Sequence, residues 1–428
     1  MTARAAETVT VGASGTRDFR LYWSADAVDR LGTQMSQIAL PLLLLDAGGS
    51  AARAGLMATL AGAGGVAAGP VAAALADGRW RGPMMRWSSL AAATAMGWAT
   101  LTVLGHRICL SCLVGALLVE RVAASCFEAA AAGSVARLVP PEWYPRAVAR
   151  LQAGEQGGAI AGPALAGLLL RQARALPFLA DTLSYLAAAF LVRAIRTDLA
   201  PPAPSGASTV PGQRFGRRMG AGIGFVRTSP FLRFLLVWSC GVNALLALLS
   251  YTTVFAVHAA YGSASVGLVL GAAAGAGLLG SLLAPVAVRR VRGGVLVVAL
   301  SWLTVPAAAG LALAGPAWVC GALLGLVALL VPSVAVVLHA RAVRVVPQHL
   351  QARVATVAGA ATAAVAMAAP ALAGALTDTV GPATVDLACA AGLALLALYA
   401  ATGPAARVDA PPAPVEAAPD DPSALERG

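Results

Sequence analysis

The sequence predicts an all-α polytopic membrane protein with twelve transmembrane helices in two pseudo-symmetric six-helix bundles. Three observations lead to this prediction. The hydrophobic fraction is 59% and the charged fraction only 11%, whereas a soluble domain carries roughly 25% charged residues. The apolar residues form blocks of about 20, the length that crosses a hydrocarbon core of roughly 30 Å. The third observation is an internal repeat that divides the chain nearly in half.

The repeat relates two segments about two hundred residues apart. The first contains Arg137-Leu-Val-Pro140, Arg146 and Gly162-Pro163-Ala-Leu-Ala-Gly167, and the second contains Arg344-Val-Val-Pro347, Arg353 and Ala369-Pro370-Ala-Leu-Ala-Gly374. Each matched residue recurs 207 positions later. A weaker match follows, with Asp181 four residues after Pro177 and Asp386 four residues after Pro382. Long parallel repeats in a membrane sequence are typical of transporters.

Short polar breaks define the predicted elements in order. The spans are residues 19–45, 53–76, 84–105, 108–136, 148–170, 175–195, 231–257, 264–288, 294–314, 317–340, 350–376 and 380–402. They give an N-terminal tail (1–18), a first bundle (19–196), a linker (197–230), a second bundle (231–402) and a C-terminal tail (403–428). We expect the Pro-rich start of the linker to be flexible, its Arg-rich part (213–230) to lie as a helix on the inner leaflet, and the C-terminal tail to be disordered.

The basic residues predict the orientation. All thirty are Arg, and none is Lys. With the N-terminus in the cytoplasm, about 24 Arg fall on the cytoplasmic side, and Arg53, Arg107, Arg171 and Arg174 fall outside. This bias follows the positive-inside rule and predicts a cell-membrane protein with both termini in the cytoplasm. The net charge of +11 therefore reflects topology, and we expect no nucleic-acid partner. We see no cleavable signal peptide in the polar first eighteen residues.

Two bundles of six spans joined by a linker resemble the major facilitator superfamily over roughly residues 19–402. In the fifth span, Gly158-Ala-Ile-Ala-Gly162-Pro163-Ala-Leu-Ala-Gly167 is similar to the antiporter motif of that superfamily, although Ala166 and Ala149 stand where the family has Gly. Glycine allows close helix contact and Pro163 permits a bend. The resemblance implies that Gly158, Gly162, Pro163 and Gly167 form a hinge and favours export. The alternative is tight helix packing without a coupling role.

The loop between the second and third spans supplies another motif of the family. Leu75-Ala-Asp77-Gly-Arg79-Trp-Arg81 resembles the signature cytoplasmic loop, with Asp77 and Arg81 matching. Gly78 replaces an Arg, Ala73 replaces the leading Gly and Gly82 replaces the final basic residue. The resemblance implies that Asp77, Arg79 and Arg81 form a cytoplasmic gate, with Asp77 facing the start of the eleventh helix, where the helix dipole favours an anion.

Charged residues within the spans are the candidates for the transport site. Arg121 resembles a buried arginine of the family, Glu120 is adjacent, and Glu128 lies seven residues on, on nearly the same helical face. Glu155 lies in the inner half of the fifth span. Buried carboxylates near an arginine can exchange protons; the alternative is a static salt-bridge network.

The first span adds three more charged residues. Asp26 and Arg30 are four residues apart and can pair along the helix, whereas Asp29 has no such local partner. Asp29 is therefore the better candidate for handling a proton or another cation. The alternative is that all three lie in the inner interface near solvent.

These patterns predict a secondary transporter, not an enzyme, that works by rocking of its two halves. Arg20-Leu-Tyr-Trp23 and Leu31-Gly32 resemble the branch of macrolide and enterobactin exporters. The resemblance implies proton-coupled export of a hydrophobic or amphipathic small molecule such as a drug, antibiotic or siderophore.

No phosphate-binding loop is apparent, and Cys109-Leu-Ser-Cys112 lacks the other half of a metal site. We therefore expect no cofactor or metal. The expected partners are a substrate, protons and lipid, and we expect a monomer. The alternatives are an importer on the same fold and a non-transporting sensor or scaffold, which has no need for costly buried carboxylates.

Overall fold

A computed structural model of the chain describes residues 3–46, 48–76, 80–105, 110–200 and 224–402. The fold prediction is confirmed, because this part of the chain forms long α-helices and one 3-10 turn, without strands. The first six helices are α1 (Ala3–Asp46), α2 (Ala51–Ala76), α3 (Arg81–Leu104), α4 (Leu110–Leu138), α5 (Tyr144–Gln172) and α6 (Leu176–Arg193). The other six are α8 (Pro230–Tyr261), α9 (Ser263–Arg290), α10 (Gly293–Leu311), α11 (Ala317–Val345), α12 (Gln348–Val380) and α13 (Pro382–Ala401).

Each predicted span corresponds to one of these helices. Eight of them are long and apolar enough to cross a membrane by length and composition. Helices α1, α3, α4 and α5 are not among the eight. Of these, α1, α4 and α5 carry the charged candidates of the transport site, and these charges lower their hydropathy. Helix α1 begins at Ala3, well before the predicted span. Residues 201–223 and 403–428, which include most of the predicted linker and the C-terminal tail, lie outside the described residues.

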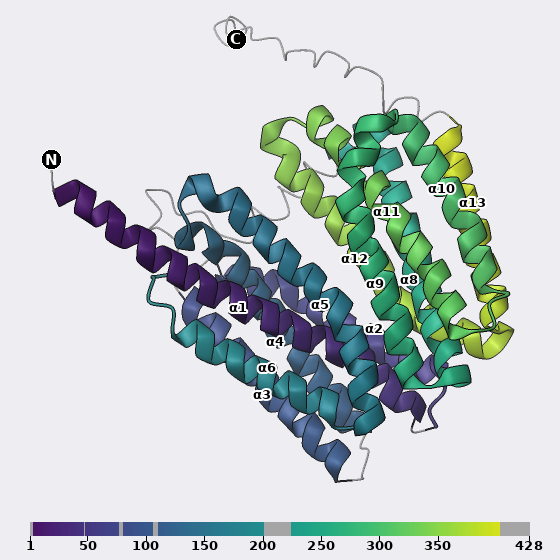
Figure 1. The fold of residues 1–428 in the computed structure, drawn as a ribbon, viewed down its shortest axis with the longest axis horizontal. Helices are drawn as coiled ribbons and strands as arrows, with labels where there is room; N and C mark the ends of the chain where they lie inside the picture. Colours follow the sequence, from purple (N-terminus) through teal and green to yellow (C-terminus); the bar gives the residue numbers. More distant parts are fainter. Residues whose placement is uncertain (1–2, 47, 77–79, 106–109, 201–223, 403–428) are drawn as a thin grey trace, which may run out of the picture.

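The two bundles repeat one packing scheme. In the first bundle, α1 packs on α5 and α6, α3 packs on α4 and α6, and α2 packs on α4. In the second bundle, α8 packs on α12 and α13, α10 packs on α11 and α13, and α9 packs on α11. The bundles contact each other mainly where α2 crosses α12 and where α5 crosses α9 (Figure 1). The helices that carry the sequence repeat, α5 and α12, therefore both lie at the interface between the bundles.

Small residues allow the backbones to touch at both crossings. A Cβ atom on Gly55 of α2 would overlap the Pro370 carbonyl of α12, and one on Gly374 of α12 would overlap the Ala51 carbonyl of α2. At the other crossing, a Cβ atom on Gly267 of α9 would lie 2.8 Å from the Pro163 carbonyl oxygen of α5. Inside lipid such close packing provides the dispersion energy that holds helices together.

Polar contacts reinforce the α2–α12 crossing. The Thr59 hydroxyl donates to the Met367 carbonyl (3.1 Å) and accepts from the Ala371 amide (3.0 Å), two groups that bond to each other in a regular helix. The Ala52 amide at the start of α2 donates to the Asp378 carboxylate (2.8 Å). Helix α12 thus binds α2 in two ways: the backbone groups of Met367 and Ala371 bind the Thr59 hydroxyl, and the Asp378 carboxylate caps the start of α2.

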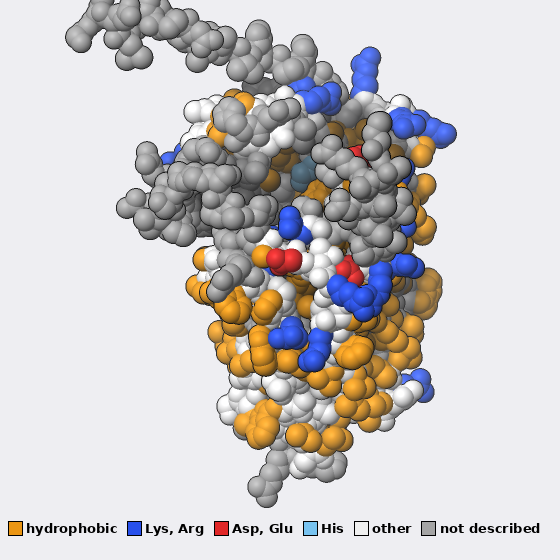
Figure 2. Space-filling model, turned by 90° about the vertical axis from the view of Figure 1, so that its left-hand side faces the viewer, with side chains coloured by type: hydrophobic (Ala, Val, Ile, Leu, Met, Phe, Trp, Pro, Cys, Tyr) orange, Lys and Arg blue, Asp and Glu red, His pale blue; other side chains and the backbone are white. Residues whose placement is uncertain are grey.

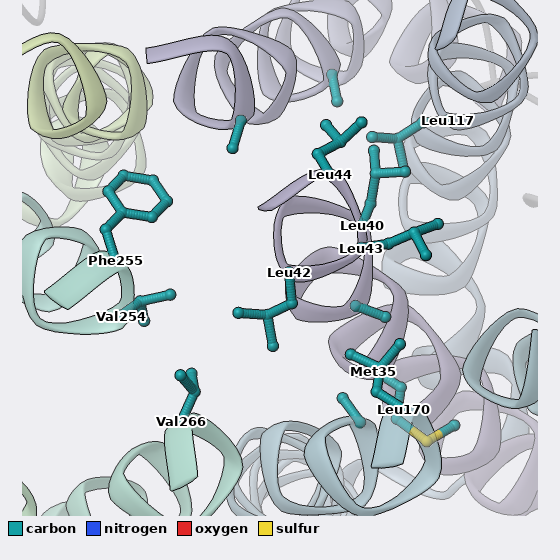
Figure 3. Close-up of a cluster of buried hydrophobic side chains, with 14 of the residues drawn as sticks. Met35, Leu40, Leu42, Leu43, Leu44, Leu117, Leu170, Val254, Phe255 and Val266 are labelled. Atoms are coloured by element: carbon teal, nitrogen blue, oxygen red, sulfur yellow. The ribbon is translucent and has the colours of Figure 1, made fainter. Parts of the chain in front are cut away.

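These contacts lie at one end of the molecule, which we call the Asp46 end because α1 ends there. Asp46 pairs with His258 of α8 (3.4 Å) and accepts from Ser263 of α9 (3.2 Å). Below these groups an apolar cluster fills the contact between the bundles: Figure 3 shows Leu42 of α1 pointing toward Val254 and Val266 of the second bundle. The Asp46 end is therefore sealed.

The opposite end, which we call the Arg-rich end, carries exposed arginines at the helix ends: Arg137, Arg146, Arg193, Arg233, Arg290 and Arg344. Figure 1 shows the bundles diverging from their contact toward this end. In Figure 2 the arginine side chains lie over the upper and middle part of the face, and mainly hydrophobic side chains lie below them. The molecule is thus closed at the Asp46 end and splayed at the Arg-rich end.

Candidate functional site

A buried polar network lies among α1, α4 and α6 in the first bundle. The Arg121 guanidinium holds the Glu120 carboxylate through two nitrogen atoms, one of them Nε at 2.6 Å. The Tyr185 hydroxyl also donates to Glu120, and Thr33 of α1 lies 2.8 Å from the Tyr185 hydroxyl. Glu120 and Tyr185 are buried. Among the predicted site residues, the structure thus places Glu120 in direct hydrogen bonds with Arg121.

Asp181 of α6 is a second buried carboxylate of the network. Its Oδ2 accepts from the Ser36 hydroxyl, and its Oδ1 lies 3.2 Å from Ser184 Oγ. A Cβ atom on Gly32 would overlap both Ser184 Oγ and the Asp181 carboxylate. Gly32 therefore lets α1 approach α6 closely enough for these hydrogen bonds to form.

Asp29 lies one turn before Gly32 and Thr33 on the same side of α1. Its side chain is buried, and its Oδ1 has no hydrogen-bond partner among the described residues. The sequence-based expectation that Asp29 lacks a local partner is consistent with this geometry.

A more open group of charges lies nearer the Arg-rich end. Arg30 Nε binds Asp26 at 2.9 Å, as the spacing predicts, and Arg30 also lies 3.8 Å from Glu155 of α5. The Glu155 side chain is 43% exposed, and Glu128 of α4 is exposed as well. Water or a substrate can reach these carboxylates, unlike those of the buried network.

The residues of the predicted hinge contact both bundles. A Cβ atom on Gly158 or Gly162 would meet α1 at Arg30 or Gln34, and one on Gly167 would lie 2.8 Å from the Ser263 carbonyl of α9. Pro163 supplies the carbonyl that approaches Gly267. The first glycines of the motif therefore pack against the charged face of α1, and its last glycine packs against α9 at the interface between the bundles.

The predicted gate is described only in part. Asp77 and Arg79 lie outside the described residues. Arg81 donates from Nε to the Ala76 carbonyl (2.8 Å) and from a terminal nitrogen to the Gly133 carbonyl (2.6 Å). In this arrangement Arg81 joins the end of α2 to α4. Pro347 directly precedes α12.

Sequence reasoning missed part of the site. Asp181 is not among the candidate site residues predicted from the sequence, yet its side chain contacts Ser36 of α1 inside the first bundle. Asp386 is buried in α13, with Oδ1 lacking a hydrogen-bond partner among the described residues. Ser36, Ser184 and Tyr185 gave no signal in the sequence, because their importance comes only from the contact of α1 with α6.

Comparisons with known proteins agree with this architecture. The family model described as Major Facilitator Superfamily matches residues 23–370. A comparison with curated protein sequences finds no significant match. Among solved structures, the chain is similar to a bacterial homologue of the iron transporter ferroportin in an inward-facing state (TM-score 0.67, 17% identity, covering 90% of this chain and 99% of that one).

Two further structures show the same fold. One is a bacterial homologue of the human lysosomal transporter Spinster in an inward-facing and unoccupied conformation (TM-score 0.64, 13% identity, 94% of this chain and 99% of that one). The other is the nucleoside transporter NupG (TM-score 0.68, 12% identity, 89% and 99%).

Proposed function

The chain belongs to the major facilitator superfamily, and we propose that this transporter exports a hydrophobic or amphipathic small molecule, such as a drug, antibiotic or siderophore, in exchange for protons. The observation that supports proton coupling is the concentration of carboxylates in one bundle. Within the predicted spans, the first bundle has Asp26, Asp29, Glu120, Glu128, Glu155 and Asp181, whereas the second has only Asp386. Ionisable residues at membrane depth are costly and mark proton relays in transporters.

The charge balance of the buried network supports an exchangeable proton. Arg121 forms paired hydrogen bonds with Glu120, and neither Asp29 nor Asp181 forms an ion pair of its own with any described residue. Two uncompensated carboxylates are expensive to bury. A static salt-bridge network needs balanced charges, so the surplus of carboxyl groups favours proton handling. In the proposal Glu128 and Glu155 exchange protons with solvent, and Asp29 holds one deeper in the bundle.

We propose that the Arg-rich end faces the cytoplasm, with both chain termini on that side. The arginine bias supports this orientation, and so does the similarity in fold to structures described as inward-facing. The conformation is then open to the cytoplasm and closed outside. Gly158, Gly162, Pro163 and Gly167 would form the hinge, and Asp77, Arg79 and Arg81 the cytoplasmic gate. The similarity of the α5 motif to the antiporter motif supports export.

Inverted membrane vesicles test the proposal. A panel of amphipathic compounds is offered outside, and accumulation is measured with and without a proton gradient that is acidic inside. We expect gradient-dependent accumulation that Glu128→Gln reduces strongly, with Glu142→Gln, an exposed carboxylate on the short 3-10 turn, as the matched control. Accumulation that ignores the gradient would exclude proton coupling. Gradient-driven loss of preloaded compound would show import. Normal transport by both Glu128→Gln and Arg121→Ala would refute the assignment of the site.

A further inference from the structure

A buried arginine of the second bundle lacks the partner that its charge requires. Arg341 lies in the last turns of α11 and is only 7% exposed. Its Nε has no hydrogen-bond partner, and its side chain forms no ion pair, among the described residues. We infer that Arg341 binds a phosphate group at the Arg-rich end of the second bundle, supplied by an anionic phospholipid headgroup or by free phosphate. This inference goes beyond the proposed function and does not rest on it, because it needs no transported substrate.

The first step is the scarcity of acidic residues in the second bundle. Asp378 and Asp386 are the only acidic residues between positions 199 and 402. Asp378 binds the start of α2 at the Asp46 end, and Asp386 lies in the first turns of α13 at the same end. In the first bundle, by contrast, Glu142 and Asp198 follow α4 and α6 at the Arg-rich end. The second bundle thus has no acidic side chain of its own at the end where Arg341 lies.

The second step is the comparison of the two repeats. The shift of 207 positions places Ser134 of α4 at the position equivalent to Arg341. Ser134 is buried, and its hydroxyl donates to the Ala130 carbonyl of its own helix (2.7 Å). The fold therefore accepts an uncharged side chain at this position. Because an unpaired buried charge is costly, an anion from outside the bundle explains why the second copy has an arginine.

The third step is the direction of the helix face that carries Arg341. Val334, Val337 and Leu338 lie on the same face of α11, within two turns of Arg341. All three are buried in an apolar cluster whose members come only from residues 225–400. This face therefore points into the second bundle and away from the space between the bundles. A ligand of Arg341 thus enters from the headgroup layer and does not lie on the transport path.

The fourth step is the choice of ligand. The guanidinium fork of an arginine matches a phosphate group and binds it through paired hydrogen bonds. Arg290 and Arg292 are exposed at the same end. Helices α10 and α12 begin there without a side-chain cap, and the dipole at a helix N-terminus favours an anion. Basic pockets between transmembrane helices bind anionic lipid headgroups, so a lipid is the preferred source of the phosphate.

The test uses the purified full-length chain in a neutral detergent. Phosphatidylglycerol, phosphatidylcholine or inorganic phosphate is added at constant ionic strength. Native mass spectrometry measures the lipid bound per chain, and thermal scans measure Tm. The variant is Arg341→Gln. The matched control is Arg344→Gln, which removes the same charge from an exposed position on the same helix.

We expect the wild type and Arg344→Gln to bind phosphatidylglycerol in preference to phosphatidylcholine. Arg341→Gln should bind phosphatidylglycerol about tenfold more weakly, because hydrogen bonds to a charged group are lost. Equal affinities of the two variants would overturn the inference, and so would a wild type without preference for phosphatidylglycerol. If inorganic phosphate alone raises the Tm of the wild type but not of Arg341→Gln, the free ion is a ligand of the site. If only phosphatidylglycerol does so, the ligand is the lipid.

A second variant separates an external phosphate from a partner within the chain. Arg341→Met removes the charge and keeps most of the length of the side chain. With phosphatidylcholine, Arg341→Met should have a higher Tm than the wild type, which buries an unpaired cation. With phosphatidylglycerol the difference should shrink or reverse. A lower Tm of Arg341→Met in both lipids, or its failure to fold, would mean that the chain itself satisfies Arg341 and would overturn the inference.

Discussion

Replacing Thr59 with Val should weaken the closure of the Asp46 end by a predictable amount. The change removes the two hydrogen bonds from the Thr59 hydroxyl to Met367 and Ala371 but conserves shape. The two backbone groups of α12 can then bond to each other, so no buried polar group is left unsatisfied. Hydrogen bonds between transmembrane helices average about 0.6 kcal/mol, so the loss is about 1.2 kcal/mol, which corresponds to roughly a sevenfold change in the conformational equilibrium.

Distance measurements between spin labels can test this number. Labels at Ala149 on α5 and Ala355 on α12, both exposed near the Arg-rich end, report how far the bundles diverge there. In a cysteine-free background, Thr59→Val should raise the population with short label distances, because the Arg-rich end closes when the Asp46 end opens. Thr59→Ser retains the hydroxyl and should behave like the wild type. Equal populations for the Val and Ser variants, or a shift toward longer distances, would refute the reasoning.

Three further predictions follow from individual contacts. Gly167→Ala should impair transport because its methyl group meets the α9 backbone, whereas Gly157→Ala, whose methyl group points into open space, should not; equal activity of the two variants would contradict the packing role of the motif. Gly32→Ala should lower Tm by forcing α1 away from Asp181 and Ser184, and an unchanged Tm would show that the helices are not in contact there. Burial opposes ionisation of Asp18, but hydrogen bonds from Thr197 and Arg196 outweigh it and lower the pKa of this carboxyl group below its usual value of 3.8. Because the folded state favours the carboxylate form, the contribution of Asp18 to the stability of the fold is fully present above about pH 4 and is lost as the pH falls further. The Tm of wild type and Asp18→Asn should therefore differ most near neutral pH and converge in acid, and a constant difference would contradict the assignment.

The fold could be predicted from the sequence because each span is defined by its own composition. Length and hydropathy located the helices, and the repeat of Gly162-Pro163 and Ala369-Pro370 identified the two equivalent helices of the bundles. The site was harder to predict. Glu128 was grouped with Arg121 because seven residues return a side chain to the same face. The structure pairs Arg121 with Glu120 instead, since Tyr185 of α6 holds the Glu120 carboxylate in place.

Asp181 shows why the remaining part could not be predicted. Its position after Pro177 was visible as half of a repeat, but the sequence does not tell which neighbour a helix faces. That depends on the rotation of α6 about its axis, and Gly32 of α1 determines how closely the two helices approach. Asp386 likewise follows a proline by four residues, although the intervening residues differ, and Asp386 lies near Cys320 and Cys389 of the second bundle. The same spacing of proline and aspartate thus has different surroundings in the two bundles.

The two crossings between the bundles share one backbone geometry but not one chemistry. Gly271 of α9 stands where Thr59 stands in α2, since both follow the contact glycines Gly267 and Gly55 by four residues. A Cβ atom on Gly271 would lie 3.8 Å from the Ile160 carbonyl oxygen and 3.2 Å from Ala164, the counterparts of Met367 and Ala371. The α2–α12 crossing is therefore held by hydrogen bonds and the α5–α9 crossing by apolar packing alone at the equivalent position. The two sides of the interface between the bundles need not move together when the bundles rock. The α5–α9 crossing can separate first, and the α2–α12 crossing separates only when the Thr59 hydrogen bonds break. One hydroxyl group added at position 271 would make the two crossings more alike.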